Sequence, residues 1–174
     1  SPAKRALLEL YLQQQHAESK ATHTETTHGP IARRASQTPA PLSPAQERLW
    51  FLNQLEPESP AYNQQAALYL TGPLNREALS ASLAQLVARQ ASLRTYYRQR
   101  AGEPLQCIDD TMIIPLRYID LHPLAPAEQA AVLQQIATED ATRPFDLING
   151  PIARFTLLKL DEEEFIFLRT LHHI

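Results

Sequence analysis

The sequence predicts an α/β protein in which helices flank a mixed sheet. From residue 44 onward, segments with helical periodicity alternate with short apolar segments typical of strands. Two pairs of neighbouring strands are separated only by short turns and should form antiparallel hairpins, whereas helical crossovers allow parallel neighbours. With 174 residues, 44% of them hydrophobic, the chain is long enough for one domain with a buried core.

The N-terminal part of the chain should lie outside that domain. Residues 1–16 are mostly good helix formers with a stripe of apolar side chains, which predicts a short amphipathic helix. Residues 17–41 are rich in Thr, Ser, Ala and Pro and have almost no large apolar side chain, which predicts a flexible linker. The domain then spans residues 42–174.

The first helix of the domain has a clear start signal. Ser43 is placed as the N-cap, Pro44 occupies the first helical position, and Gln46 stands three residues after the cap to complete a capping box. Residues 49–52 place apolar side chains over most of the helix circumference, so we expect it to be buried. Residues 56–60 contain two prolines and should end it.

The other elements follow from periodicity and turn residues. Further helices are expected at residues 76–90, with Asn75 as the N-cap, and at residues 127–141. Strands are expected at residues 62–71, 93–100, 105–108, 113–120, 152–160 and 165–171. The sequence does not fix the order of these strands in the sheet.

Two adjacent histidines, His172 and His173, directly follow the last expected strand. Successive side chains of a strand point to opposite faces, so one ring can face a cavity while the other is turned into the protein. This disfavours a two-histidine metal site, and we expect no metal; it indicates one working ring and one supporting ring. An imidazole with an ordinary pKa of about 6.5 can hold or take a proton near neutral pH. The pair by itself is equally compatible with two strand-terminal polar residues without chemistry.

Composition excludes several classes of function. The net charge is −3 and the 16 Lys and Arg residues are scattered, so nucleic acid is not an expected partner. The four glycines lie too far apart to form a phosphate-binding loop for ATP, GTP or NAD. The single cysteine, Cys107, fits a reducing cytoplasm, and no stretch approaches the roughly 18 apolar residues of a membrane span. We therefore expect a cytoplasmic protein without a membrane partner.

Four stretches, in this order and at this spacing, carry a resemblance to a known family. They are S-P-A-Q-E-R-L-W-F-L at 43–52, R-Q-A-S-L-R-T at 89–95, P-F-D-L-I-N-G-P-I-A-R at 144–154 and H-H-I at 172–174. The first matches S-x-A-Q-x-R-L-W-x-L at every specified position, the third is similar to F-D-L-x-x-G-P-x-x-R, and the last begins H-H-x-x-x-D-G. Together they resemble the condensation domains of nonribosomal peptide synthetases, over roughly the first third of that domain.

The resemblance implies the chloramphenicol-acetyltransferase-like fold of CoA-dependent acyltransferases, with this chain as the N-terminal lobe only, ending within the H-H-x-x-x-D-G motif. In that fold two α/β lobes form a tunnel. Upstream and downstream peptidyl carrier domains of a multidomain synthetase bring substrates to it on phosphopantetheine arms. The family joins an acyl or peptidyl thioester to the amine of an aminoacyl thioester. The resemblance implies no cofactor bound by the domain itself, and no activity of this piece alone.

The resemblance also assigns residues. His173 is the residue held to act as base on the amine or to position it, and His172 is its structural neighbour. Further motif positions expected to support the structure are Gln46, Arg48, Trp50, Arg94, Asp146 and Arg154. We expect the three arginines to form buried ion pairs or hydrogen bonds, because arginine among apolar motif residues is usually paired. For Gln46 we expect the capping role.

Two alternatives stay open. Epimerisation domains and other acyltransferases of the same fold share the double histidine, although the opening motif favours condensation. Heterocyclisation domains are disfavoured, because they resemble a version of the histidine motif that has Asp in place of the first His. The second alternative is a non-catalytic module that binds carrier proteins. Gln90 and Ala91 stand where the family's second motif has His and Glu, which changes the local geometry but leaves the proposed base in place.

Overall fold

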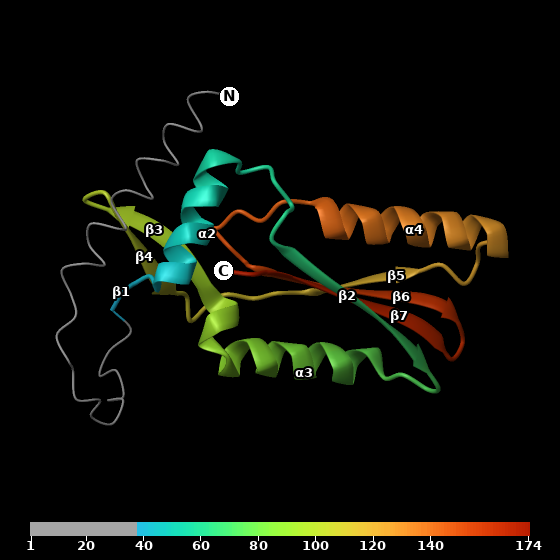
Figure 1. The fold of residues 1–174 in the computed structure, drawn as a ribbon. Helices are drawn as coiled ribbons and strands as arrows, with labels where there is room; N and C mark the ends of the chain where they lie inside the picture. Colours follow the sequence, from blue (N-terminus) through green and yellow to red (C-terminus); the bar gives the residue numbers. More distant parts are fainter. Residues whose placement is uncertain (1–37) are drawn as a thin grey trace, which may run out of the picture. The chain divides into compact units, whose positions relative to one another are not determined.

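The computed structural model describes residues 38–174 (Figure 1). The helix expected over residues 1–16 and most of the expected linker lie outside the described residues. The strands are β1 (Ala40–Pro41), β2 (Asn63–Thr71), β3 (Thr95–Arg100), β4 (Glu103–Ile108), β5 (Leu116–Asp120), β6 (Ala153–Asp161) and β7 (Glu164–His172). The helices are α2 (Pro44–Leu55), α3 (Arg76–Arg89), the 3₁₀ helix η1 (Ala91–Arg94) and α4 (Pro126–Thr142).

The larger sheet has the strand order β2-β7-β6-β5 and is mixed, as the sequence predicts. Strand β7 pairs antiparallel with both β2 and β6, while β6 pairs parallel with β5. The strand that ends at the histidine pair is therefore an inner strand. Its position between two neighbours fixes its backbone by hydrogen bonds on both sides.

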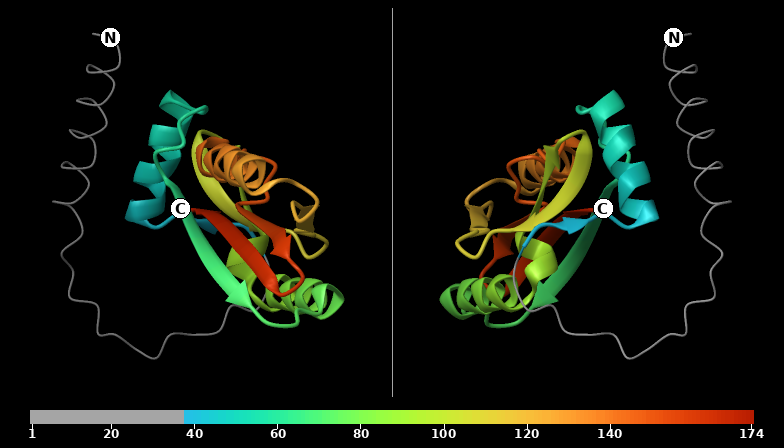
Figure 2. Two further views of the ribbon diagram at one scale, coloured as in Figure 1. Left: turned by 90° about the vertical axis from the view of Figure 1, so that its right-hand side faces the viewer. Right: turned by 90° about the vertical axis from the view of Figure 1, so that its left-hand side faces the viewer.

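Helices cover both faces of this sheet, α4 on one and α3 on the other (Figures 1 and 2). On the first face, Leu158 and Leu168 pack with Ile136 of α4. On the second, Leu157 and other strand residues pack with Leu83 of α3. Because the inner strands are buried on both faces, apolar side chains occur there at consecutive positions instead of alternating, as at residues 157–158 and 165–168.

The smaller sheet is antiparallel, with the order β1-β4-β3. The β3–β4 hairpin is confirmed, but the expected strand at residues 93–100 begins with the last two residues of η1. Ala40 and Pro41, which composition places in the linker, pair with β4 through Gln106 and Leu105. An edge strand needs only backbone pairing, so a segment with few apolar side chains can form one, and proline is tolerated there.

Helix α2 begins as predicted, with both hydrogen bonds of the capping box. The Ser43 hydroxyl accepts from the Gln46 backbone N–H at 3.3 Å, and the Gln46 side-chain oxygen accepts from the Ser43 N–H at 3.0 Å. The expectation that the helix is buried over most of its circumference is wrong, since only Leu49 and Trp50 are fully buried. The helix lies against the protein along one side: Phe51, Leu52 and Leu55 are only half-buried, and Pro44 and Ala45 are exposed.

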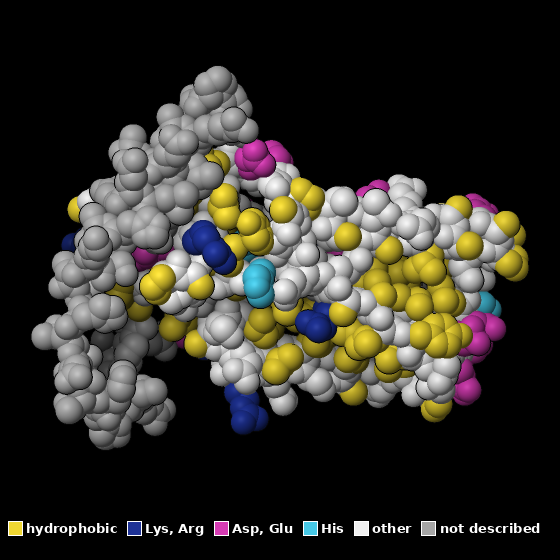
Figure 3. Space-filling model, in the orientation of Figure 1, with side chains coloured by type: hydrophobic (Ala, Val, Ile, Leu, Met, Phe, Trp, Pro, Cys, Tyr) yellow, Lys and Arg dark blue, Asp and Glu magenta, His cyan; other side chains and the backbone are white. Residues whose placement is uncertain are grey.

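Hydrophobic side chains reach the surface along β2. Leu68 and Tyr69 of this strand are 49% and 55% exposed. Figure 3 shows a broad area of hydrophobic side chains in this region, where β2 passes between α4 and α3. Within residues 38–174, β2 pairs only with β7, so its other edge carries no strand partner.

Candidate active site

The two histidines lie where β7 ends between its neighbours. His172 stands opposite Asn63 of β2, and its backbone N–H donates to the carbonyl of Ile152 at 3.0 Å. The backbone N–H of His173 donates to the carbonyl of Tyr62 on the other side, also at 3.0 Å. The His172 side chain is buried and that of His173 is exposed, as strand alternation predicts.

The ring of His172 is held by aromatic neighbours and by one hydrogen bond. The Phe145 ring meets it edge-on at a centroid distance of 6.1 Å, and the Tyr62 ring lies at 6.3 Å. Its Nδ1 accepts a hydrogen bond from the Ile174 backbone N–H at 3.1 Å, so the proton of the neutral ring sits on Nε2. Burial, with His173 adding a smaller effect, lowers the pKa of His172 to about 4. His172 is therefore a neutral, fixed acceptor near neutral pH.

His173 is presented differently. Its ring is exposed, while the backbone that carries it is tied down before and after it. The Tyr62 carbonyl accepts a hydrogen bond from the His173 backbone N–H. The hydrogen bond from the Ile174 N–H to the His172 ring restrains the backbone on the other side of His173. The arrangement leaves one imidazole exposed on a fixed backbone and buries the other as a neutral ring.

Gln46 connects the first motif with the last. Its side-chain amide nitrogen donates to the carbonyl oxygen of Ile174 at 3.4 Å and lies 3.5 Å from the oxygens of Tyr97 and Gln106. Burial raises the pKa of the Tyr97 phenol to about 12, so the phenol stays protonated in the physiological range. The sequence assigned Gln46 only the cap, because nothing in a sequence shows that residues 128 positions apart meet.

Trp50 belongs to the hydrophobic cluster on which Ile174 rests. The members of that cluster are Leu42, Trp50, Tyr97, Phe145, Leu147 and Ile152. The ring centroids of Trp50 and Tyr97 lie 6.0 Å apart. Helix α2, strand β3 and the loop before β6 thus converge beneath the segment that follows His173.

Arg94 has the buried polar contacts that its place among apolar motif residues predicts. Its guanidinium donates to the carbonyls of Val87 at 3.1 Å and Asp109 at 3.2 Å, and it forms an ion pair with Asp110. It thereby joins the end of α3 to the segment after β4. This contact set supports the fold and includes neither histidine.

Arg48 does not meet the same expectation. Its side chain is exposed, so the prediction of a buried ion pair or hydrogen bond is wrong at this position. Helix α2 buries Leu49 and Trp50, and position 48 points about 200° away from position 50 around the helix axis. A charged motif residue next to a buried one can therefore face solvent.

Arg154 of β6 fastens the C-terminal end of α4. Its guanidinium donates to the carbonyls of Asp140 at 2.9 Å, Arg143 at 2.6 Å and Pro144 at 3.2 Å. The same group lies 3.8 Å from the centroid of the Phe145 ring. Burial, and then nearby Arg143, lower the pKa of Arg154 to about 10, which leaves it charged. Arg154 therefore braces the aromatic ring that contacts His172.

Asp146 forms the turn of the same loop. Its carboxylate accepts from the backbone N–H groups of Ile148 at 2.9 Å and Asn149 at 3.1 Å, and from the Asn149 side chain at 2.6 Å. The Asn149 side chain is the main reason that the pKa of Asp146 is lowered. Gly150 closes the turn with a φ of +65°, and an added Cβ there would lie 2.8 Å from the Met112 methyl group.

Some supporting residues were missed in the sequence. Asp140 is buried on α4, and Thr170 is buried on β7 just before the histidines. A signal for Asp140 was available: it stands four residues after Ile136 on the buried stripe of the helix, where a charge is unexpected. Tyr62 gave no such signal, because its role depends on the strand order.

Two kinds of feature are absent from residues 38–174. No three side chains of His, Cys, Asp or Glu in this part of the chain are grouped so as to hold a metal ion. In the same part, no helix combines the length and the apolar character that crossing a membrane requires.

The fold is that of the CoA-dependent acyltransferases, and comparison with known proteins gives the family. The chain belongs to the condensation-domain family of nonribosomal peptide synthetases, since the family model described as Condensation domain matches residues 36–174. The resemblance carried by the four motifs is thereby confirmed.

Similar sequences are found in large synthetases. The chain is 40% identical over 174 residues to phosphinothricin tripeptide synthetase PhsC of Streptomyces viridochromogenes, covering 99% of this chain and 15% of that protein. It is 47% identical over 134 residues to a component of the linear gramicidin synthase of Brevibacillus parabrevis, covering 77% of this chain and 2% of that protein. The chain thus spans only a small part of these relatives.

Solved structures show the same fold. The chain is similar to the starter condensation domain of the rhizomide synthetase RzmA, with a TM-score of 0.71 and 28% identity. It is also similar to the first condensation domain of the calcium-dependent antibiotic synthetase, with a TM-score of 0.69 and 26% identity. Each match covers 78% of this chain, and 32% and 33% of the two solved chains. The chain thus corresponds to about a third of each solved chain.

Proposed function

We propose that this chain is the N-terminal lobe of a condensation domain that forms an amide bond between two carrier-bound substrates, with His173 acting at the amine. The observation that carries the proposal is the exposed His173 ring on a backbone fixed by Tyr62 and by the bond between Ile174 and His172. The family match supplies the reaction class.

In the proposed reaction the amine nitrogen of the aminoacyl thioester attacks the carbonyl carbon of the acyl or peptidyl thioester. The C–N bond forms, the C–S bond breaks, and the amine proton passes through the exposed imidazole of His173 to the departing thiolate. Holding both substrates in place contributes several kcal/mol by making the encounter effectively unimolecular. A general base contributes about 10²–10⁴-fold in rate.

His172 supports this chemistry without sharing the proton. Burial lowers its pKa to about 4, so the ring is a weak base, and its one unprotonated nitrogen already accepts a hydrogen bond from the Ile174 N–H. Its Nδ1 instead holds the Ile174 N–H and so the backbone around His173. This division of roles is the one that alternation along the strand suggests.

The proposal includes partners and surroundings. Upstream and downstream peptidyl carrier domains deliver the substrates on phosphopantetheine arms, and the lobe itself binds no cofactor. The lobe works inside a multidomain synthetase in the cytoplasm. The similarity to PhsC over 99% of the chain supports a domain arrangement in which the N-terminal segment of this chain is shared.

The test is a condensation assay of the synthetase that carries this lobe, with loaded donor and acceptor carriers. We expect His173→Ala to lower the rate of product formation by about 10²–10⁴-fold, the contribution of a general base. The matched control is His122→Ala, another exposed histidine, which lies beside Asp161 and Glu162. It should leave the rate unchanged.

Two results would contradict the proposal. Full activity of His173→Ala would remove the role of His173. Carrier binding without any product from the unaltered synthetase would favour the non-catalytic module instead. The present chain alone should give no product, since it covers 32% of the solved condensation domain.

A further inference from the structure

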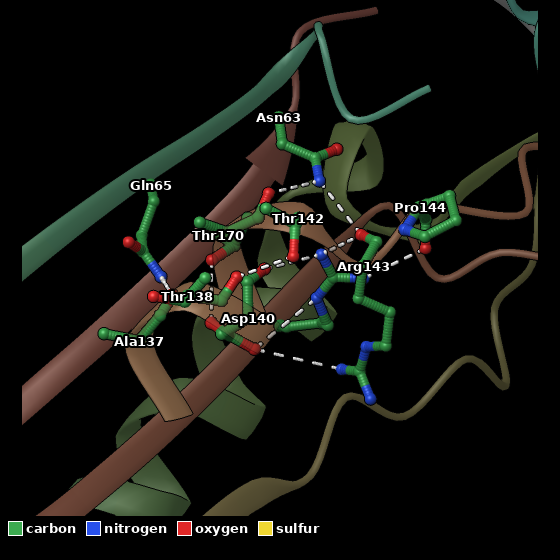
Figure 4. A network of polar contacts seen from close by, with 11 residues as sticks. Asn63, Gln65, Ala137, Thr138, Asp140, Thr142, Arg143, Pro144 and Thr170 are labelled. Carbon is green, nitrogen blue, oxygen red and sulfur yellow. Dashed lines mark hydrogen bonds and ion pairs between the residues drawn. The ribbon is translucent and has the colours of Figure 1, made fainter. Parts of the chain in front are cut away.

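A buried carboxylate contacts strand β7 two residues before the histidine pair. The Asp140 side chain is 2% exposed, in the last turns of α4 (Figure 4). Its Oδ2 accepts a hydrogen bond from the Thr170 hydroxyl at 2.8 Å. Its Oδ1 faces the Arg154 Nε at 3.6 Å and the Arg143 guanidinium at 3.9 Å. The closest of these contacts is the one to β7.

Stability alone does not account for a carboxylate at this position. A buried ion pair is offset by desolvation, and well-packed apolar residues of similar volume are often as stable or more stable. The pairing here is also loose, because the buried Arg154 Nε has no hydrogen-bond partner among residues 38–174. The contacts therefore specify geometry more than they add stability.

The first connection from Asp140 to the site runs along β7. Thr170 is fully buried and lies two residues before His172, so both side chains project from the same face of the strand. Because the Asp140 carboxylate accepts a hydrogen bond from the Thr170 hydroxyl, it fixes the distance between α4 and the end of β7. That end is where the histidine pair begins.

The second connection runs through the loop after α4. Arg154 binds the carbonyls of Asp140, Arg143 and Pro144 and lies over the Phe145 ring, which meets His172 edge-on. The orientation of the His172 ring thus depends on how Arg154 is held, and Asp140 is the carboxylate that faces it.

Strand β2 fastens the same helix end. Asn63, which pairs with His172 in the sheet, donates to the carbonyls of Ala141 at 2.8 Å and Arg143 at 2.9 Å. Gln65, the register partner of Thr170, donates to the carbonyl of Ala137 at 2.9 Å. Side chains from β2, β6 and β7 therefore all meet the end of α4 (Figure 4).

We propose that Asp140 is a positioning residue for the histidine pair, acting on β7 through Thr170 and on the His172 ring through Arg154 and Phe145. The proposal rests on the proposed function for its catalytic meaning. Its geometric part stands independently of that function, because the orientation of the His172 ring can be measured without an assay.

The first test is nuclear magnetic resonance of the 174-residue chain with ¹⁵N-labelled histidine. In the unaltered chain, His172 should show an unprotonated Nδ1 and a protonated Nε2 at pH 7, and the Ile174 amide should exchange slowly with solvent. In Asp140→Asn and in Thr170→Val we expect both tautomers of His172 and at least tenfold faster exchange of the Ile174 amide. A tenfold change corresponds to about 1.4 kcal/mol in the free energy of the opening that permits exchange. Thr170→Ser, which keeps the hydroxyl, should restore the unaltered spectrum.

The matched control is Thr156→Val. Thr156 is a buried threonine on the same face of the sheet, in β6, and its register partner is Leu168. This variant should leave the His172 tautomer and the Ile174 exchange unchanged. A folded Asp140→Asn chain, verified by its amide spectrum, with unaltered His172 and Ile174 signals would overturn the proposal.

The second test uses the synthetase with loaded carriers. Asp140→Asn and Thr170→Val should lower kcat by about 10–100-fold, as expected for a small misplacement of a reacting group, with KM changed less than twofold. Combined with His173→Ala, Asp140→Asn should lower kcat no further, whereas additive losses would indicate a general structural defect and overturn the positioning role. If His173→Ala is fully active, the proposed function fails, and the resonance test still decides whether Asp140 positions the pair.

Discussion

The side-chain nitrogen of Gln46 lies 3.4 Å from the carbonyl oxygen of Ile174, although 128 residues separate them along the chain. The same side chain caps α2 through its oxygen. One residue therefore fixes the start of a helix and the segment directly after His173. The first motif of the family contributes to the site through this contact.

The two roles of Gln46 can be separated by substitution. Gln46→Glu keeps an oxygen for the Ser43 N–H but removes the donor to Ile174, whereas Ser43→Ala removes the cap hydroxyl and leaves the donor in place. We expect Ser43→Ala to lower the free energy of unfolding by about 1 kcal/mol without affecting the Ile174 amide. Gln46→Glu should speed exchange of that amide with solvent. Urea unfolding and hydrogen exchange measure the two effects, and equal Ile174 exchange in both variants would contradict the separation.

His172 should make the stability of the lobe depend on pH. Its pKa is about 4 in the folded chain and about 6.5 when unfolded, so the unfolded chain binds more protons between these values. Stability should therefore fall as the pH is lowered from about 6.5 towards 4. Because solvent partly screens the ring, we expect the free energy of unfolding to fall by only about 1–2 kcal/mol.

The measurement is urea unfolding of the unaltered chain and of His172→Asn between pH 7 and pH 4.5. The carboxylates titrate alike in both proteins, so the difference between their unfolding free energies isolates the histidine. That difference should shrink as the pH falls. A difference that stays constant over this range would show that His172 is not buried as a neutral ring.

Arg94 and Arg48 should respond oppositely to the same substitution. Arg94→Met deprives the carbonyls of Val87 and Asp109 of their donor and breaks the ion pair with Asp110. We expect a loss of about 2–3 kcal/mol of unfolding free energy. Arg48→Met, at an exposed position, should change it by less than about 0.5 kcal/mol. Thermal or urea unfolding decides, and comparable losses in the two variants would refute the assignment of burial.

Local signals in the sequence predicted much of the fold. The cap at Ser43, the cap at Asn75 and the hairpin turns mark element ends because each depends on side chains only a few residues apart. Predictions failed where burial was judged from composition. Arg48 is exposed and Ala40 lies in a strand. The residues of a segment do not specify which other part of the chain it packs against.

The sequence by itself determined the α/β class, the family motifs and the opposite orientation of the two histidine rings, because period and alternation are local properties of the backbone. Only the tertiary structure decided that β7 lies between β2 and β6, that Gln46 reaches Ile174, and that Asp140 contacts Thr170. These contacts join segments far apart in the chain. Their partners are selected by strand order and by helix packing, which a single sequence does not specify.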